Sequence, residues 1–286
     1  MNTPGPAPAG MGPKRVDITD DISIGPGLSL VLIAGPCVIE SGDHLLDIAA
    51  KMAEISRSCG IPYILKTSFD KANRTSGKSY RGPGLEEGLR IMAEVKERTG
   101  LPILLDVHER DQIAPAAEVA EILQIPAFLC RQTDFVQDVA RSGRVVNIKK
   151  GQFLAPWDLR HVVEKIEAVG NTRILLTERG TSFGYNNLVV DFSALPVMAS
   201  LGYPVVFDAT HSVQLPGGAG NATGGRRQYV RHLARAAVAV GVDSLFLEVH
   251  DSPDDAPCDG QNMLSLEEMP LLLDEVLSIR KALNGR

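Results

Sequence analysis

The chain has 286 residues, 44% of them hydrophobic, and a formal net charge of −6. Its hydrophobic content excludes a chain that is disordered throughout, and its acidic balance argues against general nucleic-acid binding. No run of residues approaches the roughly 20 apolar positions that a membrane helix needs. We therefore expect an enzyme-sized folded chain with no membrane and no nucleic-acid partner.

The first residues are rich in Gly, Pro and Ala and contain no apolar signal core, so residues 1–15 are expected to form a flexible tail. The four cysteines do not make a disulfide framework in a chain of this length, which favours reduced thiols and a cytoplasmic location. They are Cys37, Cys59, Cys130 and Cys258.

After the tail, residues 16–24 are expected to form a β-hairpin that ends at Gly25-Pro26-Gly27. Eight short apolar runs then alternate with eight helical patterns, and the runs carry little polar alternation, as is typical of strands buried on both faces. The strands are expected at 28–34, 63–67, 103–107, 122–125, 145–149, 174–177, 205–208 and 245–249. The helices are expected at about 44–59, 86–98, 110–120, 134–142, 157–169, 195–201, 227–240 and 265–283.

Eight such units predict the α/β fold class, with residues 16–286 forming a single (β/α) eight-stranded parallel barrel, the TIM barrel, whose N-terminal β-hairpin plugs the bottom. A doubly wound open sheet is the structural alternative. The segment Ala34-Gly35-Pro36-Cys37 after the first strand does not fit a dinucleotide-binding fingerprint, which open sheets of this kind often carry.

Basic side chains gather where the predicted strands end, which is the active-site end of such a barrel. They are Lys66, Lys71, Arg74, Arg131, Lys149, Lys150 and Arg179. Guanidinium and ammonium groups bind phosphate and carboxylate oxygens, so a basic mouth on an acidic protein predicts substrates with more than one such group. The alternative is a structural network of ion pairs with Asp70, Asp106 or Glu178.

A second set, Cys37, His211, Glu248 and Asp259, follows the first, seventh and eighth strands. The first and eighth strands are neighbours in a closed barrel, so these four side chains can converge. A thiolate, an imidazole and two carboxylates suit a divalent metal ion such as Zn, Fe(II), Mn or Co. The alternative is a buried cysteine that serves as a small apolar residue and a histidine that is satisfied by hydrogen bonds.

Longer motifs make the chain resemble the 3-deoxy-D-manno-octulosonate 8-phosphate synthases over about residues 30–263. They include Ala34-Gly35-Pro36-Cys37, Arg81-Gly82-Pro83-Gly84, Asp106-Val107-His108-Glu109, Glu178-Arg179-Gly180, Asp208-Ala209-Thr210-His211-Ser212, Cys258-Asp259-Gly260, and the runs 66–76, 125–134 and 147–153. The resemblance implies condensation of phosphoenolpyruvate with D-arabinose 5-phosphate and water, which releases phosphate and serves lipopolysaccharide synthesis. It also implies a homotetramer.

The resemblance assigns roles to individual residues. It implies phosphoenolpyruvate binding by Lys66, Arg131, Lys149, Gln152 and Arg179, and sugar-phosphate binding by Ser68, Lys71, Asn73, Arg74 and Ser76. It implies catalytic roles for Lys71, His211, Asp259 and Cys37, and a metal site of Cys37, His211, Glu248 and Asp259. Cys37 stands where metal-independent members carry Asn, and Gly151 where many of them carry Pro, so the metal-dependent class is favoured.

Three other functions compete with this one. The sister 3-deoxy-arabino-heptulosonate 7-phosphate synthases share the barrel, the Gly-Pro-Cys motif and the metal, but their sugar-binding loop usually has the sequence Lys-Pro-Arg-Thr-Ser, whereas this chain has Lys71-Ala72-Asn73-Arg74-Thr75-Ser76. A metal-dependent aldolase or hydrolase on the same barrel would not need so many anion-binding positions. A non-catalytic barrel would not need both sets of residues.

Overall fold

The computed structural model describes residues 14–74, 76–217 and 224–284. Eight parallel strands form a closed barrel, because β11 pairs with both β8 and β14 and the remaining strands follow in chain order. The barrel strands are β3 (Val31–Gly35), β4 (Tyr63–Thr67), β5 (Ile103–Asp106), β6 (Ile122–Ile125), β7 (Val145–Lys149), β8 (Ile174–Glu178), β11 (Val205–Asp208) and β14 (Ser244–His250). Closure confirms the predicted barrel and excludes the open sheet.

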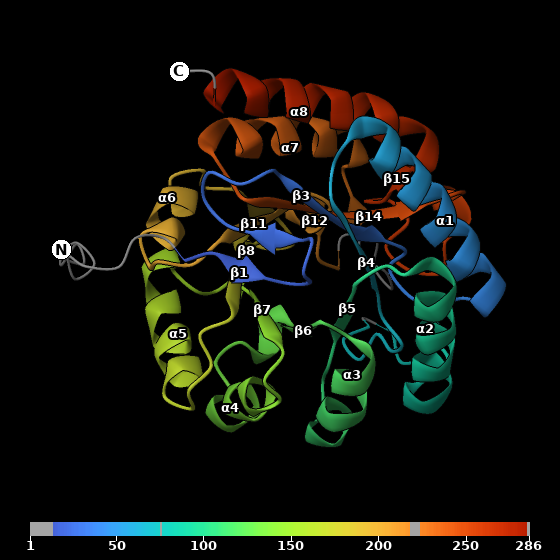
Figure 1. The fold of residues 1–286 in the computed structure, drawn as a ribbon, viewed down its shortest axis with the longest axis horizontal. Coiled ribbons are helices and arrows are strands. Elements are labelled where there is room, and N and C mark those ends of the chain that lie inside the picture. Colours follow the sequence, from blue (N-terminus) through green and yellow to red (C-terminus); the bar gives the residue numbers. More distant parts are fainter. Residues whose placement is uncertain (1–13, 75, 218–223, 285–286) are drawn as a thin grey trace.

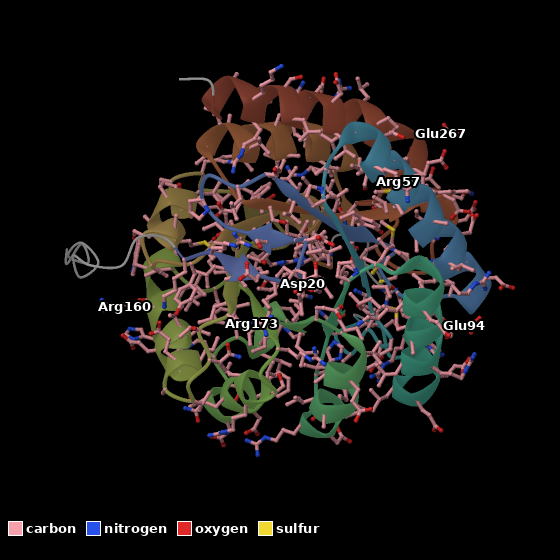
Figure 2. All side chains as sticks on the ribbon, in the orientation of Figure 1. Asp20, Arg57, Glu94, Arg160, Arg173 and Glu267 are labelled. Atoms are coloured by element: carbon pink, nitrogen blue, oxygen red, sulfur yellow. The ribbon has the colours of Figure 1, made fainter. Side chains whose placement is uncertain are left out.

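Helices form a ring around the strands, and each consecutive pair of barrel strands is joined through one of them (Figure 1). They are α1 (Gly42–Cys59), α2 (Leu85–Thr99), α3 (Ile113–Val119), α4 (Thr133–Arg141), α5 (Leu159–Glu167), α6 (Ala194–Ala199), α7 (Val230–Val240) and α8 (Met269–Asn284). The main apolar core fills the layer between this ring and the barrel. Charged side chains such as Arg57, Glu94 and Arg160 lie on the outer side of the ring (Figure 2).

Local sequence sets the ends of these helices. The Ser41 side chain accepts a hydrogen bond from the His44 backbone N–H at 3.2 Å and caps the start of α1. Gly60 ends the same helix in the left-handed conformation, with φ 69°, which a residue without a Cβ adopts at low cost. The predicted helix at 110–120 begins instead with a 3₁₀ turn, Arg110–Gln112, and α3 follows it.

The predicted hairpin closes the amino-terminal end of the barrel. Strands β1 (Val16–Asp17) and β2 (Ser23–Ile24) pair antiparallel and cross this end (Figure 1). Val16, Ile18 and Ile24 pack against the apolar side chains that fill the lower barrel interior. Arg173, beside the hairpin in Figure 2, donates a hydrogen bond to the Asp17 carbonyl at 2.9 Å. The plug leaves the opposite end of the barrel open for a site.

Residues 1–13 of the predicted tail lie outside the described residues, so the tail stays a prediction. Lys14 is anchored, since its Nζ donates to the Tyr203 hydroxyl at 2.6 Å. Four shorter strands, β9 (Thr181–Ser182), β10 (Leu188–Val189), β12 (Gln214–Leu215) and β13 (Gly224–Gly225), form two small ladders, and β15 (Leu264–Ser265) pairs in parallel with the last residues of β14. Among the described helices none is both long and apolar enough to cross a membrane.

Candidate active site

A cavity of about 360 Å³ opens at the carboxyl ends of the barrel strands. Its lining carries five cationic side chains, Lys66, Lys71, Arg74, Lys149 and Arg179, and three carboxylates, Asp106, Glu109 and Asp259. The cations therefore outnumber the carboxylates within a protein whose overall charge is negative. Such an excess attracts anionic ligands into the barrel.

Lys149 is the last residue of β7 and is buried at the bottom of this cavity. Its Nζ pairs with Asp208 and lies 3.6 Å from the centroid of the Phe246 ring. Burial, together with smaller effects of the charges of Lys66 and Arg179, lowers the pKa of Lys149 to about 8 against the opposing effect of Asp208. An anionic ligand beside this ammonium group would favour its charged form.

Arg179 follows β8 and is also buried. Its Nη2 donates to Gln214 Oε1 at 2.6 Å, while its Nη1 is buried with no hydrogen-bond partner among the described residues. Gln152 lies in the same lining, and its Oε1 is likewise buried without a partner. Buried polar groups are rarely left unpaired, so this part of the cavity has the character of a preformed ligand site.

Lys66 and Lys71 both face Glu248, and each Nζ lies 3.6 Å from Glu248 Oε1. Lys66 also donates to Ser68 Oγ at 3.1 Å, and Ser68 in turn donates to Asp106. Burial alone would raise the pKa of Asp106, but Lys66 and His108 hold it well below its usual value. Ser68 therefore lies behind the cavity lining, where it positions charged groups.

Of the predicted sugar-phosphate residues, Lys71, Asn73 and Arg74 line the cavity, whereas Ser68 and Ser76 do not. Arg74 donates to Cys258 Sγ at 2.7 Å and to the Pro257 carbonyl at 3.2 Å. Ser76, like the predicted phosphoenolpyruvate residue Arg131, is absent from the described lining. Of the thirteen residues with a predicted anion-binding or catalytic role, the structure thus places nine in the lining and two, Ser68 and Cys37, against lining residues, but not Ser76 and Arg131.

The predicted metal-binding side chains come together beside this cavity. His211 Nε2 lies 3.5 Å from Glu248 Oε1 and 3.9 Å from Asp259 Oδ2, and Cys37 Sγ lies 3.8 Å from the same Asp259 oxygen. Asp259 is in the left-handed region, with φ 50°, an uncommon conformation for a residue with a Cβ. Its carboxylate is shared by the thiol on one side and the imidazole on the other.

The chemistry of this cluster fits a divalent metal ion. Both oxygens of Glu248 are buried and have no hydrogen-bond partner among the described residues. Burial opposes ionisation, but His211, Lys71 and Lys66 lower the pKa of Glu248 to about 2, so it is a carboxylate at neutral pH. Asp208 Oδ2 lies 2.8 Å from His211 Nδ1, which leaves Nε2 facing the cluster. A carboxylate that orients the far nitrogen of an imidazole is typical of metal-binding histidines.

Three residues of this site were not predicted to have these roles. Cys258 Sγ lies 2.8 Å from Cys37 Sγ and could hold a metal together with Cys37 and Asp259. Its position next to Asp259 was a signal that sequence reasoning could have used. Asp208 ends the strand predicted at 205–208, but the sequence assigns it no role. Gln214, which donates to Asp259 Oδ2 at 3.2 Å, carries no signal in the sequence.

Comparison with known proteins agrees with this geometry. The model of the DAHP synthetase I family matches residues 13–283. The protein called 2-dehydro-3-deoxyphosphooctonate aldolase in Trichlorobacter lovleyi is 59% identical over 90% of this chain and 95% of its own length. Proteins of the same name in a Cyanothece species and in Syntrophotalea carbinolica are 58% and 59% identical over 94% and 93% of this chain, and over 98% and 96% of their own lengths. The chain therefore belongs to the DAHP synthetase I family.

Proposed function

We propose that this protein condenses phosphoenolpyruvate with D-arabinose 5-phosphate and water to give 3-deoxy-D-manno-octulosonate 8-phosphate and phosphate. The name shared by the relatives, 2-dehydro-3-deoxyphosphooctonate aldolase, refers to the same eight-carbon phosphorylated keto acid. The observation that carries the proposal is the cavity, in which an excess of cations adjoins two sets of potential metal ligands that share Asp259: His211, Glu248 and Asp259, and Cys37, Cys258 and Asp259. Two anionic substrates and a polarisable aldehyde call for both features.

Phosphoenolpyruvate fits the deeper part of the cavity. Lys149 and Arg179 would pair with its carboxylate and phosphate, with Gln152 and Lys66 beside them. The unpartnered Nη1 of Arg179 supports this position, because a carboxylate or phosphate oxygen of the ligand would accept its hydrogen bond. Arg131 remains a predicted member of this pocket.

The sugar phosphate fits the part of the cavity that is lined by Lys71, Asn73 and Arg74. Ser68 would act indirectly, through its hydrogen bonds with Lys66 and Asp106. Ser76 remains a predicted contact to the sugar phosphate. We also propose a homotetramer, as the resemblance of the sequence implies. A cytoplasmic location is also proposed, since both substrates are charged phosphate esters that do not cross membranes freely.

Cys37, His211, Glu248 and Asp259 would hold a divalent metal ion, with Fe(II), Zn, Mn and Co all compatible with these ligands. Such an ion would supply Lewis-acid polarisation next to the sugar aldehyde. Both oxygens of Glu248 are buried and accept no hydrogen bond from the described residues, although Lys66 and Lys71 lie 3.6 Å from Oε1, and this supports the assignment.

The chain's own residues perform three tasks in this proposal. The two anion pockets bring the enol carbon to the aldehyde carbon, and such positioning lowers the barrier by fixing the geometry in advance. Lys71, in its protonated form, stabilises the oxygen that becomes negative as the aldehyde is attacked. Lys71 then supplies the proton that this oxygen finally takes up, whereas His211, oriented by Asp208, serves as a ligand of the proposed metal.

Substrate choice tests the proposal. Phosphate release from phosphoenolpyruvate should depend on arabinose 5-phosphate and should be at least about tenfold slower with erythrose 4-phosphate. Turnover with erythrose 4-phosphate but not with arabinose 5-phosphate would instead assign the heptulosonate reaction. Release of phosphate without any sugar would assign a hydrolase.

A further inference from the structure

A second group of potential ligands lies outside the cavity lining. Glu40 precedes α1, His44 is in the first turn of α1, and His250 is the last residue of β14. One potential ligand atom from each of these three residues lies within 4.8 Å of those of the other two. The His44 and His250 rings have their centroids 4.8 Å apart. Chain segments that are distant in sequence therefore bring two imidazoles and a carboxylate together.

Asp251 lies beside both imidazoles. One of its oxygens, Oδ1, is 2.9 Å from His44 Nε2 and 3.1 Å from His250 Nδ1. A carboxylate that bonds one nitrogen of an imidazole directs the other nitrogen toward a metal. The other nitrogen of His44, Nδ1, is buried and has no partner among the described residues. The other nitrogen of His250, Nε2, lies 2.7 Å from Glu40 Oε1, and Nδ1 also accepts a hydrogen bond from the Ser252 backbone N–H at 2.9 Å. An ion bound at Nε2 would therefore require the ring proton to move to Nδ1, where Asp251 Oδ1 would accept it in place of the Ser252 donation.

We propose that Glu40, His44 and His250 form a second metal site, which takes a divalent transition-metal ion of the Zn or Co type. Two imidazoles and one carboxylate are a ligand set that such ions favour and that Mg and Ca ions do not. Asp251 orients both rings from behind. Three protein ligands leave a further position for water, in keeping with the partial exposure of Glu40 and His44.

The position of this site suggests a structural role. Asp251 begins the segment that leads through Cys258 to Asp259, and His44 belongs to α1. An ion bound by Glu40, His44 and His250 would therefore fasten the start of this segment to the helix ring. The inference does not depend on the reaction that the cavity catalyses.

Cobalt binding separates the two sites. The full-length protein is stripped with a chelator and titrated with Co²⁺, with bound metal measured after desalting and cobalt absorption recorded in parallel. Cys37 at the first site gives a thiolate-to-cobalt charge-transfer band, whereas the second site contains no sulfur. We expect about two cobalt ions per chain, of which one contributes no charge-transfer absorption.

His44→Ala should lower the bound cobalt from about two ions to about one and leave the thiolate band unchanged. Glu40→Gln, which keeps the size of the side chain, should do the same. His161→Ala is the matched control, because His161 is an exposed histidine on α5 that pairs with Glu164 elsewhere on the surface. This variant should bind as many cobalt ions as the unmodified protein. If the unmodified protein binds one ion that gives the thiolate band, or if both variants retain two ions, the cluster is a hydrogen-bonded network and the proposal is overturned. One ion without the thiolate band, lost in His44→Ala, would support the second site and count instead against the first.

Discussion

At the scale of single residues, the charge of Lys149 depends strongly on its surroundings. Burial lowers its pKa to about 8, and phosphoenolpyruvate would bind the protonated form. We therefore expect kcat/KM for phosphoenolpyruvate to fall as the pH rises through about 8. The free energy of unfolding should instead rise with pH between pH 8 and about 10. In this range the unfolded chain holds the Lys149 proton more tightly than the folded chain does.

Lys149→Arg tests this assignment, since a guanidinium group stays charged throughout this range. The variant should have a lower kcat/KM at neutral pH, because the shape of the guanidinium group differs. The pH at which kcat/KM for phosphoenolpyruvate declines should rise by about one unit or more. Steady-state rates between about pH 6 and about pH 10 give the measurement. An unchanged decline would assign it to another group.

Arg74 contacts the segment that carries Cys258 and Asp259, and it lines the proposed sugar-phosphate pocket. Arg74→Ala should raise the KM for the sugar by about tenfold or more and change that for phosphoenolpyruvate much less, because a charge-assisted contact is lost. Arg57→Ala, on the outer side of α1, is the control. The reverse order of the two KM effects would exchange the pockets.

At the scale of elements, close contact between β3 and β4 holds Lys66 in place. A Cβ built on Gly35 would lie 2.0 Å from the Lys66 carbonyl oxygen, so the two backbones would have to separate. Gly35→Ala should lower the free energy of unfolding by about 1–3 kcal/mol, as measured by urea denaturation, and should also reduce activity. Gly77→Ala should change little, because no described atom lies within 4 Å of a Cβ there. Equal stability of the two variants would argue against this packing.

The barrel strands could be predicted because they are apolar and buried on both faces. The observed ends of two strands differ from the predicted ends, because other interactions act there. The strand predicted at 28–34 begins at Val31, since the Leu28 N–H bonds to the Gly25 carbonyl in a turn. The strand predicted at 245–249 extends from Ser244 to His250, because its polar ends also pair with neighbours. Strands of two residues, such as β12, carry no readable pattern.

The site could be predicted in part for a similar reason. Residues at strand ends, such as Lys149 and Glu248, converge in any closed barrel, so their positions follow from the fold. Residues on the connecting loops depend on the path of each loop. Arg131 is exposed and outside the described lining, whereas Gln214 reaches both Arg179 and Asp259. Sequence reasoning from strand ends could not distinguish these two.

At the scale of the whole molecule, large aromatic side chains remain exposed on a single chain. Phe153, Phe183 and Tyr185 are 58%, 68% and 99% exposed. Exposed aromatic surface is typical of subunit interfaces, which supports the proposed tetramer. Light scattering should give a mass about four times that of the 30.7 kDa chain. A monomeric mass at the concentrations used for assays would contradict it.

In the proposed function, one cavity binds two anionic substrates beside a metal cluster and condenses them. Phosphate release from phosphoenolpyruvate and arabinose 5-phosphate, measured before chelation, after chelation and after return of a divalent metal, tests it most directly. We expect activity that depends on the sugar, falls by about a hundredfold or more on chelation and recovers with the metal. Full activity in the metal-free protein, or no activity with arabinose 5-phosphate under any condition, would contradict the account.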